Sequence, residues 1–163
     1  MPAKQIVFAL VTALHDLFTA AWIGGLLTLV LSVLPAARKT LGMETTQRLM
    51  DAIQKRLSVV IYVSMVGLAV TGLLLSNRAP GFEGLFHFGT RYATLLSLKH
   101  LAMLLMVGLA LFRSLGLARL RLPAPRKQKL SLALLVANLL LGVLVLLLTG
   151  FLAAVGSVIA PVG

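Results

Sequence analysis

The chain has 163 residues, of which 60% are hydrophobic, and its mean hydropathy is +1.03. A soluble domain has only about 45–50% apolar residues, so this composition indicates a membrane protein. The absence of cysteine excludes disulfides, zinc–thiolate sites and iron–sulfur clusters. The net charge of +11 lies mainly in short loops between apolar runs, which indicates topogenic charge and no nucleic-acid partner.

Four apolar runs are long enough to cross a bilayer, which takes about 20 residues. They cover roughly residues 5–34, 57–76, 92–112 and 130–155. We expect all four to be helices, because a helix satisfies its own backbone hydrogen bonds in lipid. The predicted fold is all-α: a polytopic membrane protein with one domain, an antiparallel bundle of four transmembrane helices over residues 1–163.

Residues at the ends of these runs give further expectations. The first helix is expected to end at Pro35 and the third at Arg113. Residues 43–55 are expected to form a separate short helix on the membrane surface, because apolar and charged residues alternate there with helical spacing. The segment Pro123–Pro125 is expected to be an extended turn. His87 is expected to lie in an outer loop, as a plain loop histidine or as a first ligand for an arriving metal.

The basic residues predict the orientation of the chain in the membrane. Most of them fall in the loops between the first and second spans and between the third and fourth: Arg38, Lys39, Arg48, Lys55, Arg56, Arg113, Arg119, Arg121, Arg126, Lys127 and Lys129. Basic loops stay in the cytoplasm. We therefore expect a multi-pass protein of the bacterial cytoplasmic membrane with both termini on the extracytoplasmic side.

A short repeated motif indicates internal duplication. The second span contains Val70-Thr71-Gly72-Leu73 and the fourth contains Leu148-Thr149-Gly150-Phe151. The first and third spans each carry a histidine next to a charged residue. Two similar helical hairpins are the pattern expected of a parallel repeat.

Two pairs of ionisable residues lie within the expected spans: His15–Asp16 in the first and Lys99–His100 in the third. Such groups cost a few kcal/mol each in hydrocarbon, so they are candidates for function. At 1.5 Å per residue, both histidines lie about 12–15 Å below the outer membrane edge. Because the first and third helices of an up-down-up-down bundle are diagonal neighbours, we expect His15 and His100 to share one site.

Haem b is one candidate occupant of that site. Its axial ligands would be His15 with either His100 or Lys99. Trp22 lies seven residues after His15 and so shares its helix face. Arg91, at the outer end of the third span, would meet a haem propionate.

Copper is the other candidate occupant. His100, Met103 and Met106 follow at i, i+3 and i+6 and supply imidazole and thioether groups, which favour Cu(I). Asp16 is expected either to pair with Lys99 or to orient a histidine by accepting its proton in a hydrogen bond.

The run HDLFTAAWIGG from His15 to Gly25 resembles the first helix of the CopD (copper resistance protein D) family, which has a histidine, small apolar residues, a tryptophan, one further residue and two glycines. Residues 70–74 and 91–99 are similar to later stretches of that family. The resemblance implies copper uptake or homeostasis across the cytoplasmic membrane. It marks His15, Trp22 and Lys99 as positions of the family type.

The same four-helix core is similar to the HemJ-type protoporphyrinogen oxidases, which bind haem b and carry a histidine in helix one and a lysine in helix three. His15 and Lys99 match these types. The Asn-Glu-x-Pro signature of that family is absent, because residues 122–126 read LPAPR. This argues against the oxidase activity and leaves haem binding open.

Three functions follow from these observations. The first is a copper-handling membrane protein, in which copper arrives from outside, passes His100 with Met103 or Met106, and reaches His15. The second is a haem b redox protein or small oxidase with a periplasmic electron-transfer partner. The third is an accessory subunit of a larger membrane complex. The sequence leaves open whether the protein is an enzyme.

Overall fold

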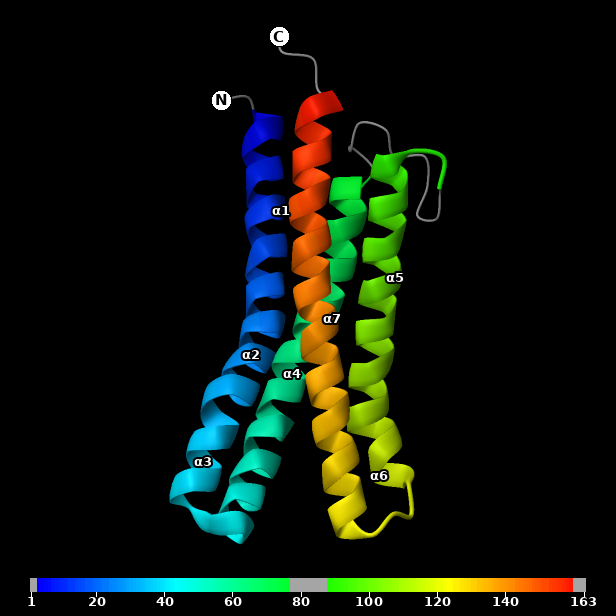
Figure 1. Ribbon diagram of the computed structural model, residues 1–163. Helices are drawn as coiled ribbons and strands as arrows, with labels where there is room; N and C mark the ends of the chain where they lie inside the picture. The colour runs from blue at the N-terminus through cyan, green and yellow to red at the C-terminus, as the bar shows by residue number, and fades with distance from the viewer. Residues whose placement is uncertain (1–2, 77–87, 160–163) are drawn as a thin grey trace. The chain divides into compact units, whose positions relative to one another are not determined.

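The computed structural model describes residues 3–76 and 88–159, and His87 lies outside them. Within the described residues, four helices are long and apolar enough to cross a membrane (Figure 1): Ala3–Thr40, Gly42–Leu75, Arg91–Gly116 and Ala124–Gly156. The prediction of an all-α polytopic membrane protein is confirmed. The chain forms two compact units that divide between residues 78 and 79, each built from two of these helices.

The first membrane-crossing helix runs without a break to Thr40, so the expected end at Pro35 was wrong. Its parts are α1 (Ala3–Thr19), the π-helical turn η1 (Ala20–Gly24), α2 (Gly25–Thr28), the π-helical turn η2 (Leu29–Val33) and α3 (Leu34–Thr40). The N–H of Leu34 bonds to the carbonyl of Leu29, the spacing of a π-helix. Pro35, which has no N–H to donate, follows a turn that is already widened, and the helix continues past it.

The second helix, α4 (Gly42–Ser76), starts after a tight turn. Gly42 has a φ of 70°, a left-handed conformation that favours glycine. The Thr46 hydroxyl donates to the carbonyl of Ala37 at 2.9 Å and ties α4 to α3 across this turn. Residues 43–55 are the first turns of α4, so the prediction of a separate surface helix is corrected. Lys, Arg, Glu and Gln are good helix formers, and the helix therefore does not break where the apolar run ends.

Small residues bring α1 and α4 together as a hairpin (Figure 1). Gly67 of α4 lies against the ring of Phe18, and a Cβ atom at position 67 would overlap that ring. Nearer the turn, a Cβ atom at Gly25 would lie 2.9 Å from Cδ1 of Leu57. Glycines at such contacts let two helix backbones approach closely.

The second unit is also a helical hairpin, in which α5 packs against α7 (Figure 1). Its elements are α5 (Arg91–Leu111), the π-helical turn η3 (Phe112–Gly116), α6 (Leu117–Arg119) and α7 (Ala124–Ile159). Thr90 caps α5 by accepting a hydrogen bond from the N–H of Ala93 at 3.1 Å. The expected end at Arg113 was wrong, because η3 carries the helix on to Arg119 with Arg113 buried.

The two prolines expected in an extended turn have different positions. Pro123 precedes α7, and its carbonyl accepts the N–H groups of Arg126 and Lys127, both at 3.0 Å. Pro125 lies in the first turn of α7, where a missing N–H is tolerated because that group has no partner within the helix. The extended turn is therefore shorter than expected and ends at Pro123.

We expect Gly67→Ala to lower the thermal stability of the detergent-purified protein, because the added methyl group meets the Phe18 ring. Overpacking of this kind costs about 1–3 kcal/mol. Gly24→Ala in the same unit is the matched control, since no atom lies within 4 Å of a Cβ there. Equal unfolding temperatures for the two variants would contradict the close packing of Gly67 on Phe18.

Candidate functional site

His15 is half-buried on α1 and makes a hydrogen bond to the partner helix. Its Nδ1 lies 2.8 Å from Oγ1 of Thr71 on α4. The Thr71 hydroxyl itself donates to the carbonyl of Gly67 at 2.6 Å. Because a hydroxyl has a single hydrogen and a carbonyl can only accept, Nδ1 of His15 must be the donor to Thr71.

This chain of hydrogen bonds fixes the tautomer that a neutral His15 ring adopts. With the hydrogen held at Nδ1, the neutral imidazole carries its lone pair at Nε2. Metal-binding histidines commonly have this arrangement, in which one ring nitrogen donates to a fixed acceptor and the other is the ligand. Thr71 therefore acts as a positioning residue for His15.

Two glycines of α4 lie near this part of α1. Phe18 lies one turn further along α1 against Gly67. A Cβ atom at Gly72 would lie 3.6 Å from Cε1 of His15, so glycine leaves that ring edge uncovered by a side chain at position 72. Trp22 is 2% exposed in the core, and among the described residues its Nε1 has no hydrogen-bond partner.

His100 on α5 has the same ring state by a different route. Its Nδ1 lies 2.7 Å from the carbonyl oxygen of Leu96, one turn earlier on the same helix. A carbonyl only accepts, so Nδ1 carries the hydrogen and the neutral ring again has its lone pair at Nε2. Met103, one turn after His100, is half-buried, and Met106 is 2% exposed.

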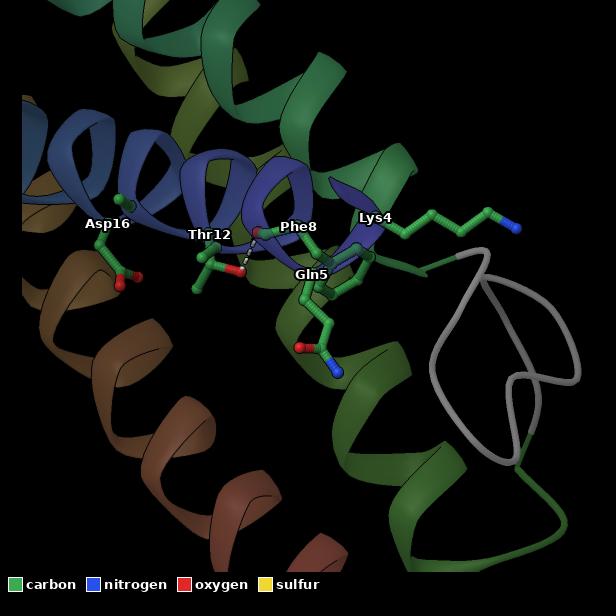
Figure 2. Close-up of a pocket in the computed structure, with 7 residues that line it drawn as sticks. Lys4, Gln5, Phe8, Thr12 and Asp16 are labelled. Atoms are coloured by element: carbon green, nitrogen blue, oxygen red, sulfur yellow. Dashed lines mark hydrogen bonds between the residues drawn. The ribbon is translucent and has the colours of Figure 1, made fainter. Parts of the chain in front are cut away.

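The charged candidates differ in their exposure. Lys99 is half-buried, whereas Arg91 is exposed as the first residue of α5. Asp16 is exposed and lines an open groove along α1, together with Lys4, Gln5, Phe8, Ala9, Thr12 and Ala13 (Figure 2). In this groove the Thr12 hydroxyl donates to the carbonyl of Phe8 at 3.0 Å (Figure 2). Nδ1 of His15 bonds to Thr71, so Asp16 does not occupy that position.

Asn138 of α7 is a buried polar residue that sequence reasoning missed. It is 3% exposed, and its Nδ2 donates to the carbonyl of Met106 at 3.0 Å. In the described part of the chain its Oδ1 has no hydrogen-bond partner. His15 was chosen from the sequence because a polar group inside an apolar run is costly. The same argument applies to the amide of Asn138 and would have identified it as a candidate.

Thr71 was noticed in the sequence only as part of the repeated motif, and its contact with His15 had no sequence signal of its own. The structure brings His15 and Thr71 together in one unit, and in the other it places Met103 one turn after His100 on α5. Clusters of three or more His, Cys, Asp or Glu side chains do not occur among residues 3–76 and 88–159. The expectation that His15 and His100 share one site stays a prediction.

The comparisons with known proteins give one family. The sequence model of copper resistance protein D, CopD, matches residues 51–152. This match covers more than half of the chain, and the chain therefore belongs to the CopD family. Thr71, Lys99, His100, Met103, Met106 and Asn138 lie inside the matched region, whereas His15 and Trp22 lie before it. No curated protein and no solved structure matches the chain.

We expect Thr71→Val to change the tautomer of His15, because valine keeps the shape of the side chain but removes the acceptor of the Nδ1 hydrogen. In ¹⁵N NMR spectra of histidine-labelled protein at neutral pH, the His15 ring of the wild type should show a protonated Nδ1 and an unprotonated Nε2. Thr71→Val should show a mixture of tautomers, and Thr71→Ser should behave as the wild type. Unchanged signals in Thr71→Val would contradict the role of Thr71.

Proposed function

We propose that this member of the CopD family handles copper within the membrane, with imidazole and thioether groups as the ligands of Cu(I). Copper is the cargo in this proposal. Family membership supports the link to copper. The observation that supports the ligands most directly is the state of the two intramembrane histidines, both of which hold a hydrogen at Nδ1.

The state of these rings suits metal binding for a physical reason. A histidine whose tautomer is already fixed loses little orientational freedom when it binds a metal ion. His15 is fixed by Thr71 at 2.8 Å and His100 by the Leu96 carbonyl at 2.7 Å. In each neutral ring Nε2 is then the nitrogen that would face copper.

The thioethers supply the preference for copper over harder cations. Met103 and Met106 follow His100 on α5 at the spacing that places neighbouring side chains one turn apart. Thioether sulfur favours Cu(I), whereas Mg²⁺ and Ca²⁺ favour carboxylate and carbonyl oxygen. Cu(I) also carries a single charge, so its transfer into an apolar region costs less than transfer of a divalent ion.

The path that we propose for copper begins at the extracytoplasmic side, passes His100 and the methionines, and reaches His15. This direction depends on the orientation of the chain. The basic residues at the α3–α4 turn and at the α6–α7 connection support a cytoplasmic location for these two connections. The same rule supports residence in the cytoplasmic membrane with both termini outside.

A visible absorption spectrum of the detergent-purified protein separates copper from haem b. We expect a colourless protein with no Soret band, as the copper proposal requires. Sharp haem bands that disappear in His15→Ala would contradict copper as the occupant and favour the haem alternative, with His15 and His100 or Lys99 as axial ligands.

Copper binding is the direct test of the proposed ligands. We expect His15→Ala, and separately the double variant Met103→Leu/Met106→Leu, to weaken Cu(I) binding by at least about tenfold, because each removes a ligand atom. The measurement is competition with a chromophoric Cu(I) chelator, using purified protein in detergent.

Met43→Leu is the matched control for the methionines. Met43 is 83% exposed at the start of α4, outside the apolar run, and its replacement should leave the affinity for Cu(I) unchanged. Full copper binding in both the His15 and the methionine variants would overturn the ligand assignment. A loss only in the methionine variant would remove His15 from the site.

A further inference from the structure

The end of the first long helix carries a groove that the copper proposal does not use. It is lined by Val30, Leu34, Pro35, Arg38 and Lys39. The first three residues form an apolar wall, and the two cations follow one turn later on the same helix. The whole groove lies near the end of a membrane-crossing segment, Ala3–Thr40.

Among residues 3–76 and 88–159, no acidic side chain pairs with either cation of the groove. The chain has four acidic residues in total. Close to the groove in sequence, Glu44 is paired with Arg48 at 2.7 Å. In the described part of the chain, neither Arg38 nor Lys39 takes part in a salt bridge, and both side chains are exposed. Both cations are therefore available to an anionic group from outside the chain.

The groove belongs to the fold and does not have to be formed when a ligand arrives. The π-helical turn η2 and Pro35 together alter the backbone hydrogen-bond pattern of the helix at this point. The N–H of Leu34 bonds to Leu29, and Pro35 has no N–H, so the Val30 carbonyl receives no bond from either residue. The helix surface beside Val30 and Leu34 is fixed by this backbone pattern.

The order of apolar wall and cations matches the chemistry of a phospholipid. Val30 and Lys39 are nine residues apart, which is about 14 Å along a helix. An acyl chain would lie along Val30 and Leu34, with the phosphate group near Arg38. The guanidinium group binds phosphate with two parallel hydrogen bonds, and Lys39 adds a second charge. A free phosphate ion would use the cations but not the apolar wall.

We propose that this groove binds an anionic phospholipid, with its phosphate on Arg38 and Lys39 and its first acyl carbons along Val30, Leu34 and Pro35. Basic residues near the surface of an anionic membrane are attracted to its negative charge. The second charge therefore favours an anionic over a zwitterionic headgroup. This proposal is independent of copper and of the two histidines.

The test compares lipids added to the detergent-purified protein. Phosphatidylglycerol should raise the thermal unfolding temperature by several degrees, whereas phosphatidylcholine with the same acyl chains should have a much smaller effect. The double variant Arg38→Gln/Lys39→Gln should lose most of the difference between the two lipids. The double variant Lys55→Gln/Arg56→Gln removes the same charge from exposed positions of α4 and should keep the difference between the two lipids.

A structural role of the same cations gives a different result. Arg38 and Lys39 lie in the last turn of α3, where positive charge also stabilises the helix end. If that were their whole role, the double variant would unfold earlier by the same amount in both lipids, and the proposal would be overturned. If the double variant folds poorly, Arg38→Lys takes its place in the test. This variant keeps the charge but loses the pair of parallel hydrogen bonds, so it should lose part of the difference between the two lipids.

Two further outcomes would overturn the proposal. Equal stabilisation of the wild type by both lipids would show that only the acyl chains matter. Full protection by inorganic phosphate, without lipid, would show that the cations bind free anions. Direct observation of one bound phosphatidylglycerol by native mass spectrometry, reduced in the Arg38→Gln/Lys39→Gln variant, would support it.

Discussion

The need to satisfy every polar group without water governs this protein. In hydrocarbon the backbone can do so only within helices, and polar side chains must find acceptors nearby. Thr12, Thr19, Thr71 and Thr149 each donate to the carbonyl four residues earlier on their own helix. Once Thr71 has used its hydrogen in this way, it can only accept from His15. The state of the candidate copper ligand thus follows from the ordinary behaviour of a threonine in a membrane helix.

Two hydrogen bonds that cross between helices connect this local rule to tertiary structure. His15 bonds to Thr71 in one unit, and Asn138 bonds to the Met106 carbonyl in the other. Each joins the two long helices of its hairpin within a largely apolar segment. A polar contact is therefore well suited to fix the register of helices that are hydrophobic on every face. Gly67 and Phe18 add a steric constraint close to the first of these bonds.

Hydropathy predicted the four spans but not the ends of the helices. It measures the apolar thickness that a helix must cross, and α4 begins at Gly42, well before its apolar run, because charged residues continue a helix readily. Pro35 did not end the first helix, because the widened turn η2 precedes it and the helix continues to Thr40. For the candidate site, the cost of burial identified His15 and His100 from sequence. Thr71 is 56 positions from His15, and no periodicity in an all-apolar helix could predict that contact. Asn138 was within reach of the same argument and was overlooked.

The two hairpins that contain the repeated Thr-Gly motif hold their histidines in the same ring state. Both units are hairpins in which the first helix carries a histidine and the second carries a Thr-Gly pair. In the first unit the threonine accepts the Nδ1 hydrogen, whereas in the second the carbonyl of Leu96 does so and Thr149 donates to Val145. If the halves arose by duplication, the acceptor has changed while the ring state has stayed the same. The need to satisfy the N–H group in an apolar segment accounts for both hydrogen bonds, and the ring state that results, with the lone pair at Nε2 of the neutral ring, is the one that the copper proposal requires.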